Sequence, residues 1–295
     1  MRPLLRLLAL SLLALPLAAQ LQPLQVRDDA GRAVTLPAPA QRIVALAPHL
    51  YELLQAIGAE EQLVGVSRHS VAGPARWPVV GDAHSLNLEA IAALRPDLVL
   101  AWQSGTPQRQ REALRQLGLP VFESEIRSVE AMADTLRRLG TLTGRSAAAE
   151  AAADALLRDW QALQARYRGA APVRVFYQVW DAPLMTFNGQ HLVSQAMRAC
   201  GGVGGFDTLA PLTPTVSREA VLAYNPQLLL TGQSEPGTAS LQAWRAWPQL
   251  EAVRLAQLVR VDGDALTRMS PGFVPAAAGL CAVIDATRQH LSTPR

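Results

Sequence analysis

The 295-residue sequence predicts an α/β protein made of two similar lobes with mostly parallel sheets, joined by one long rigid helix. Residues 87–101 and 217–231 carry the same pattern, NLEAIAALRPDLVLA and SREAVLAYNPQLLLT, with six of fifteen positions identical. Strand and helix patterns alternate in both halves, which is typical of parallel sheets. Between the halves, residues 146–168 form an alanine-rich stretch without glycine or proline.

Each copy of the repeat reads as a short amphipathic helix, a proline and a continuous apolar run. Pro96 and Pro226 end the helices because the proline ring clashes with the preceding turn and has no N–H to donate. The apolar runs that follow are typical of strands buried on both faces of a parallel sheet. We therefore expect one such unit in each lobe.

The first 19 residues are typical of a cleavable secretion signal. Arg2 and Arg6 precede an apolar core, and cleavage is expected after Ala19. A membrane anchor is the alternative, but the apolar run is short for a span of about 20 residues. No cysteine follows this segment directly, so we expect an exported protein without a lipid anchor.

The first half of the mature chain is expected to hold a hairpin and the first lobe. Residues 20–41 are predicted to form an N-terminal hairpin segment with its turn at 29–31. The first lobe is expected at 42–144, and it begins with the apolar strand RIVALAP, which Pro48 ends. Its remaining predicted elements are strands at 63–67, 97–102 and 120–124 and helices at 50–57, 109–118 and 129–144.

A linker helix is expected at 145–169, with Ser146 as its N-cap. Alanine and leucine dominate this stretch, and at 1.5 Å per residue it spans roughly 35 Å, about the diameter of a lobe. We interpret it as a rigid strut between the lobes. An ordinary surface helix of one lobe is the alternative.

The second lobe is expected at 170–295. It begins with VRVFYQVW, which parallels RIVALAP, and ends in a helix from Pro271 to about His290. The glycine-rich GGVGG at 201–205 follows no predicted strand, so it is a weak signal of dinucleotide binding, and we interpret it as a helix stop and a flexible loop. The other predicted elements are a strand at 258–263 and helices at 190–199 and around 240–247.

The two cysteines, Cys200 and Cys281, both fall in the second lobe. An even count in an exported chain indicates one disulfide, with two free buried thiols as the alternative.

Composition excludes several functions. All 27 basic residues are arginine, so there is no lysine for a phosphate-binding loop or a Schiff base. Without the two arginines of the signal the chain has 25 basic and 24 acidic residues, and no dense basic run indicates nucleic acid as a partner. The sequence contains no GxSxG, HExxH or CxxC motif, so we expect no enzyme.

Aromatic and polar side chains directly follow the predicted strands. In open α/β sheets ligands bind beyond the carboxyl ends of the strands, so these positions are candidate ligand contacts. They are Tyr51, His69, Trp102, Trp180, Asp264 and Arg268. The set is aromatic and lacks paired carboxylates, which favours a pocket for a large, flat, partly polar ligand over a catalytic centre.

Each of these candidates also has a simpler interpretation. Trp102 and Trp180 are alternatively core aromatics, Asp264 is alternatively a turn residue, and Arg268 is alternatively its partner in a surface ion pair. The loop histidines, together with Asp264, raise the question of a transition-metal site. No closely spaced HxH or HxxxH pair is present among them, so we expect no metal site. They are His49, His69, His84 and His191.

The stretches VRDDAGRAVTLPAPAQRIVALAP, NLEAIAALRPDLVLAW and VSREAVLAYNPQLLLT resemble the periplasmic substrate-binding proteins of ABC importers for iron-siderophores, haem and cobalamin. The resemblance covers nearly the whole mature chain and is strongest to the members that bind cobalamin. It implies two Rossmann-like lobes joined by a rigid helix, a monomer in the periplasm and no cofactor. It also implies delivery of a corrinoid, or alternatively of haem or a ferric siderophore, to a permease dimer in the inner membrane.

The resemblance also implies roles for single residues. Trp102, Asp264 and Arg268 would contact the ligand, and His69 would replace an aromatic contact. Glu89 and Glu219 match two lobe-tip glutamates that dock onto arginines of the membrane transporter.

The sequence departs from the cobalamin-binding members at two aromatic walls of the pocket. Those members carry a tryptophan near Ala83 and another near Leu212, where this chain has none. We expect Trp180 to compensate for one of these losses.

Overall fold

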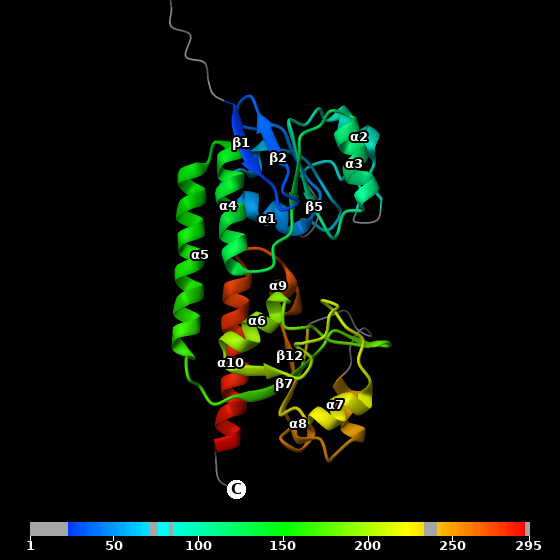
Figure 1. The fold of residues 1–295 in the computed structure, drawn as a ribbon, viewed down its shortest axis with the longest axis vertical. Coiled ribbons are helices and arrows are strands. Elements are labelled where there is room, and N and C mark those ends of the chain that lie inside the picture. The colour runs from blue at the N-terminus through cyan, green and yellow to red at the C-terminus, as the bar shows by residue number, and fades with distance from the viewer. Residues whose placement is uncertain (1–22, 71–75, 83–84, 233–240, 293–295) are drawn as a thin grey trace, which may run out of the picture.

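The computed structural model describes residues 23–70, 76–82, 85–232 and 241–292. The predicted signal at 1–19 and His84 lie outside the described residues. Two α/β lobes lie one above the other, and helix α5 (Ser146–Arg166) runs along the side of both (Figure 1). No helix in the described ranges is both long and apolar enough to cross a bilayer.

The N-terminal lobe is built on a parallel four-stranded sheet in the order β4-β3-β5-β6. β3 and β5 lie at its centre and are largely buried, as continuous apolar strands of a parallel sheet should be. The strands are β3 (Ile43–Ala45), β4 (Leu63–Val66), β5 (Leu98–Trp102) and β6 (Val121–Ser124). The helices are α1 (Pro48–Ala56), η1 (Glu60–Gln62), α2 (Leu88–Ala93), α3 (Gln108–Gln116) and α4 (Val129–Thr143).

The C-terminal lobe repeats this arrangement with a parallel sheet in the order β10-β7-β11-β12. The strands are β7 (Val173–Gln178), β10 (Gly202–Gly204), β11 (Leu228–Gly232) and β12 (Leu258–Val261), with the short antiparallel pair β8 (Trp180–Asp181) and β9 (Leu184–Met185). The helices are α6 (Leu192–Ala199), α7 (Arg218–Tyr224), η2 (Leu241–Ala246), α8 (Glu251–Arg254), α9 (Gly263–Thr267) and α10 (Phe273–Ser292).

The two copies of the sequence repeat occupy equivalent places. β5 and β11 each stand third in their sheets, and each follows a short helix, α2 or α7. The helix starts are also equivalent, because the Asn87 side chain accepts from the Ala90 N–H and the Ser217 side chain accepts from the Ala220 N–H. The prediction of one such unit in each lobe is confirmed.

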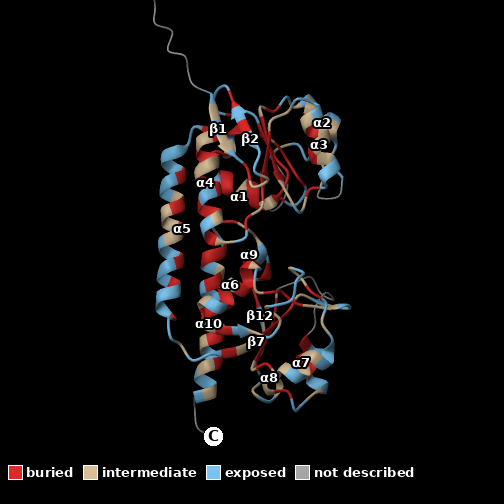
Figure 2. Cartoon of the chain, viewed as in Figure 1, coloured by how far each residue is buried: buried red, intermediate tan, exposed pale blue. Residues whose placement is uncertain are grey.

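The long helix α5 packs against α4 of the upper lobe and α10 of the lower lobe (Figure 1). Its buried face carries Ala149, Ala153 and Trp160, and the Trp160 ring lies 5.9 Å from the Phe273 ring of α10. Figure 2 shows the outer face of this helix exposed and the sheets buried. Ser146 is the first helical residue rather than the N-cap, so that detail of the prediction is wrong.

Several predicted elements differ from the structure. Gly202–Gly204 of the GGVGG stretch pairs parallel with β7, so the expected flexible loop is strand β10. Backbone pairing stabilises this strand, and glycine gives no side-chain signal of it. Pro48 begins α1 rather than ending a strand, because its fixed φ suits the first helical turn. The last helix begins at Phe273 instead of Pro271, and the helix expected around 240–247 is the 3-10 helix η2.

The N-terminal hairpin and the disulfide are both present. β1 (Leu24–Arg27) and β2 (Ala33–Leu36) pair antiparallel, as predicted. Cys200 is bonded to Cys281. The bond ties the end of α6 to the middle of α10, inside the C-terminal lobe, so the predicted disulfide is confirmed.

Candidate functional site

A cavity of about 360 Å³ lies between the two lobes, and we call it the Trp102 cavity. The upper lobe lines it with residues that follow β5 and β6, and the lower lobe lines it with residues that follow β7, β9 and α9. The site therefore lies beyond the carboxyl ends of the sheets, where ligands of open α/β sheets bind. Its main lining residues are Trp102, Ser104, Glu125, Ile126, Arg127, Val179, Phe187, His191, Leu212, Thr267 and Met269.

Trp102 is held in place by its own loop and by α1. It is the last residue of β5, and its ring meets the edge of the His49 ring at 5.6 Å. Gly105 makes room for the indole, because a Cβ at this position would come within 1.8 Å of it. The indole Nε1–H is buried and has no acceptor among the described residues.

His49 lies behind Trp102 and is itself buried. Burial, with a smaller contribution from the positive charge of Arg268, lowers the pKa of His49 to about 3. The ring is therefore neutral at physiological pH, and its Nε2 has no partner among the described residues.

The opposite wall of the Trp102 cavity is formed by Phe187 and His191. The two rings are stacked, with centroids 3.7 Å apart and an interplanar angle of 10°. His191 is the N-cap of α6, and its Nδ1 accepts a hydrogen bond from the Val193 N–H. Burial lowers the pKa of His191 to about 4, so the ring is neutral and carries its proton on Nε2. The wall thus combines an apolar face with one N–H donor.

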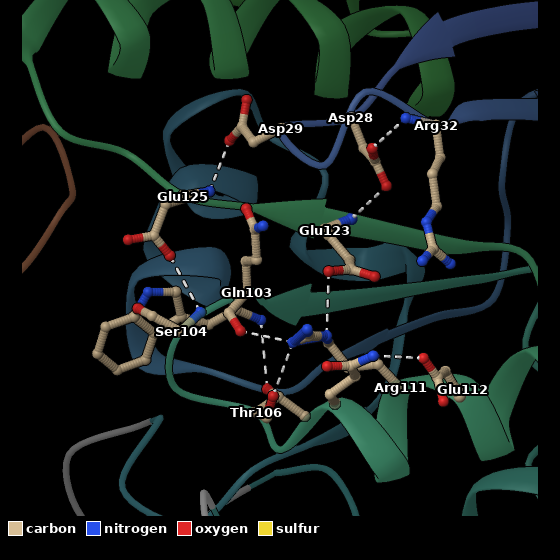
Figure 3. A network of polar contacts seen from close by, with 12 residues as sticks. Asp28, Asp29, Arg32, Gln103, Ser104, Thr106, Arg111, Glu112, Glu123 and Glu125 are labelled. Carbon is tan, nitrogen blue, oxygen red and sulfur yellow. Dashed lines mark hydrogen bonds and ion pairs between the residues drawn. The ribbon is translucent and has the colours of Figure 1, made fainter.

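A polar network fixes the loops that carry the upper wall (Figure 3). The Asp29 carboxylate accepts from the Glu125 N–H at 2.6 Å, and Glu125 in turn accepts from the Ser104 N–H at 3.0 Å. Behind them, Arg111 pairs with Glu123 at 3.0 Å. The N-terminal hairpin, through Asp29, therefore positions the loop after β6 that lines the cavity.

A second cavity of about 500 Å³ lies between α1 and the residues that precede α10, and we call it the Tyr51 cavity. It is lined by Tyr51, Glu52, Gln55, Ala56, Ser70, Arg268, Ser270, Pro271 and Gly272. Arg268 Nη1 donates to Glu52 Oε1 at 2.7 Å, an ion pair that joins the lobes. The predicted alternative, a pair between Arg268 and Asp264, is not what the structure shows.

Segment 267–270, which begins at the last residue of α9, separates the two cavities. Thr267 and Met269 line the Trp102 cavity, whereas Arg268 and Ser270 line the Tyr51 cavity. This alternation follows from the extended backbone at Arg268, since successive side chains of an extended chain point to opposite sides. One short segment therefore contributes to both cavities.

Asp264 lines a third, smaller cavity of about 110 Å³ in the lower lobe, next to Tyr177. This cavity shares Val179, Phe187 and Thr267 with the Trp102 cavity, so the two adjoin. Burial raises the pKa of Tyr177, and the nearby acidic side chains add to the effect.

The structure thus gathers four predicted site residues in adjoining cavities and leaves the others outside them. The four are Tyr51, Trp102, Asp264 and Arg268. Trp180 is 43% exposed on β8, and its indole N–H donates to the Ala182 carbonyl. His69 is exposed, with a left-handed φ of 64°. Within the described ranges no group of three His, Cys, Asp or Glu side chains could hold a metal ion.

The two glutamates of the repeat lie on the surface. Glu89 and Glu219 are both exposed, each in the first turn of its helix, α2 or α7. A hydrogen bond from its own backbone N–H lowers the pKa of Glu219, and one from Ser217 contributes as well. Both carboxylates therefore face the positive end of a helix.

Most of the residues that line the Trp102 cavity were not predicted as ligand contacts, and Phe187, His191 and Met269 are three examples. Phe187 and Met269 carry no local signal of a site, because they face the cavity only through the packing of the lobes. The sequence did offer one indication for His191. It directly precedes the apolar helix 192–199, and polar groups at a helix start are often exposed.

Comparisons with known proteins agree with this architecture. Residues 43–265 match the family described as periplasmic binding protein. A vitamin B12-binding protein of Vibrio cholerae is 34% identical over 257 residues, which is 86% of this chain and 92% of the relative. One from Yersinia pestis is 33% identical over 252 residues, 84% of this chain and 88% of the relative.

Solved structures give the same result. The crystal structure of the periplasmic vitamin B12 binding protein of Vibrio cholerae is similar with a TM-score of 0.77 and 32% identity, covering 85% of this chain and 99% of that one. A periplasmic heme-binding protein from Roseiflexus has a TM-score of 0.74 but 22% identity, over 85% of this chain and 100% of that one, and so shares the fold. All of these relatives are binding proteins rather than enzymes. With its paired parallel sheets, long side helix and interlobe cavities, the chain belongs to the periplasmic binding protein family.

Proposed function

We propose that this protein captures a corrinoid of the cobalamin class between its lobes in the periplasm. The observation that carries the proposal is the Trp102 cavity, in which aromatic walls from both lobes enclose a small number of hydrogen-bond donors. Such a combination suits a large ligand with apolar faces and polar edges. The relatives named vitamin B12-binding proteins, at 33–34% identity over most of the chain, support the same ligand class.

The chemistry of the walls matches this ligand. Trp102 offers an apolar face, with Phe187 and His191 on the opposite side. The Nε2–H of His191 is a donor that suits the amide oxygens at the edge of a corrin ring. A corrinoid is larger than the Trp102 cavity alone, so it must extend past segment 267–270 toward Tyr51, Asp264 and Arg268. Trp180 on β8 and the exposed His69 complete the proposed contacts from outside these cavities.

Delivery follows from membership of a family that supplies ABC importers. We propose that residues 1–19 are removed on export and that the mature protein acts as a monomer, with lobes at 42–144 and 170–295 joined by the linker at 145–169. Glu89 and Glu219, one on each lobe, would contact arginines of the permease dimer in the inner membrane. Their equivalent positions in the two lobes and their exposure support this role.

Titration with cyanocobalamin tests the ligand. Purified mature protein should bind it in isothermal titration calorimetry, and Trp102→Ala should weaken binding by roughly 1–3 kcal/mol through loss of a buried aromatic contact. Trp247→Ala is the matched control, because Trp247 is also a partly buried indole but lines none of the three cavities. Haem and a ferric siderophore are titrated in parallel. Binding of either of them in place of the corrinoid would overturn the proposed ligand and leave the class of protein intact.

A further inference from the structure

The cavities are lined by both acidic and basic side chains, and the basic ones are paired with acidic ones. Among the described residues, the three cavities expose three carboxylates and two guanidinium groups to a ligand. These are Glu52, Glu125, Asp264, Arg127 and Arg268. Both cations are already paired with carboxylates of the same cavities, Arg268 with Glu52 at 2.7 Å and Arg127 with Glu125 at 3.3 Å.

The Glu52–Arg268 pair is the more deeply placed of the two cationic sites. The Arg268 side chain is 36% exposed and that of Glu52 is 25% exposed, whereas the Arg127 side chain is 54% exposed. Arg268 Nη1 donates to Glu52, and Arg268 also lines the Tyr51 cavity. A guanidinium has five N–H donors, so a neutral acceptor can bind it without displacing Glu52.

We infer that Glu52 is a specificity-determining residue, which neutralises Arg268 and makes the cleft select ligands with amide side chains over ligands with carboxylates. The inference rests on the proposed corrinoid function and deepens it. An amide oxygen accepts from the free N–H groups of Arg268 while the ion pair stays intact. A ligand carboxylate at the same place meets the negative charge of Glu52 beside it, and like charges placed together disfavour binding.

The same balance disfavours dicarboxylate ligands such as haem. Each propionate of a haem needs a cation or several donors, and both cations of the described cavity linings are already paired. The neutral His191 ring supports this selection, since its Nδ1 is occupied by the Val193 N–H and its Nε2 carries a proton. This nitrogen therefore offers a donor to an amide oxygen rather than a lone pair to a metal.

Carboxylated forms of the same ligand provide the test. Mild acid hydrolysis converts single propionamide side chains of cyanocobalamin into carboxylates, and the separated monocarboxylic isomers differ from the parent only in that group. Because both Glu52 and Arg268 are partly exposed, water screens the repulsion, and we expect the wild-type protein to bind at least one isomer about tenfold more weakly than cyanocobalamin. Glu52→Gln keeps the size and an acceptor oxygen but removes the charge, and it should reduce this ratio to about twofold or less.

Glu61→Gln is the matched control, because Glu61 is exposed on η1 of the same lobe and lines none of the three cavities. It should leave the tenfold ratio unchanged, and circular dichroism on heating confirms that both variants are folded. Equal binding of cyanocobalamin and all isomers by the wild-type protein would overturn the inference without any variant. A ratio that persists in folded Glu52→Gln would also overturn it. Failure of the wild-type protein to bind cyanocobalamin at all would instead overturn the proposed function.

Discussion

The buried His49 predicts a specific dependence of stability on pH. Its folded-state pKa is about 3, lowered by burial and then by Arg268, against about 6.5 in an unfolded chain. Below pH 6.5 the unfolded state takes up a proton that the folded state does not bind. The free energy of unfolding therefore falls as pH falls from 6.5 toward 3, and His49 contributes no pH dependence above 6.5.

The size of this effect follows from the shift. Each pH unit between the two pKa values costs about 1.4 kcal/mol of stability. Between pH 7.5 and 4.5 the loss from His49 is therefore about 3 kcal/mol. Because the side chain is 3% exposed, solvent screening does not reduce the figure substantially.

The His49→Phe variant isolates this contribution from the carboxylates that titrate in the same range. At pH 7.5 His49 is neutral in both the folded and the unfolded state. The difference in the free energy of unfolding between the two proteins in urea at this pH therefore gives the effect of packing next to Trp102 alone. At pH 4.5 the wild-type protein loses the contribution of His49 and the variant does not. The difference in the free energy of unfolding should therefore shift by about 3 kcal/mol in favour of the variant. A difference that stays constant between the two pH values would refute the argument that His49 remains neutral in the folded protein.

Two further predictions concern the disulfide and the repeat. The Cys200–Cys281 disulfide closes a loop across a separation of 81 residues. Its reduction should lower the free energy of unfolding by about 4 kcal/mol, measured by urea titration with and without reductant. An unchanged midpoint of unfolding would contradict this prediction. The Glu89→Ala/Glu219→Ala double variant should keep its melting temperature and ligand affinity but lose importer-dependent uptake in cells, because both helices retain their Asn87 and Ser217 caps. Normal uptake by the double variant would contradict the docking role and leave the two carboxylates only their effect on the helix starts.

Features encoded within one or two turns of chain were predictable from the sequence. The repeat was recognisable because a proline stop and a strand buried on both faces are local patterns, and they recur at 87–101 and 217–231. β10 was not predictable, because Gly202 and Gly204 have no side chains to form a pattern and the strand exists only through pairing with β7.

The candidate site also contains some residues that local sequence patterns predicted and others that they could not predict. The rule that ligands bind beyond strand ends selected Trp102, the last residue of β5, and Asp264, shortly after β12, and both line the cavities. Phe187 faces the cavity only after the β8–β9 pair folds back and the lobes meet, so no local pattern marks it. Glu52 was also missed, because its partner Arg268 is 216 positions away and the pair forms only across the lobes.

Segment 267–270 shows why a list of candidate residues does not define a site. Asp264 and Arg268 were predicted together, yet they line different cavities, because Asp264 lies within α9 whereas Arg268 follows the last residue of α9, where the backbone becomes extended. Met269 lines the Trp102 cavity, while its neighbour Arg268 ties the lower lobe to Glu52. A ligand that shifts this segment therefore also shifts the ion pair between the lobes. The lining of the Trp102 cavity and the ion pair between the lobes share one short stretch of backbone, so a substitution in the segment should alter both.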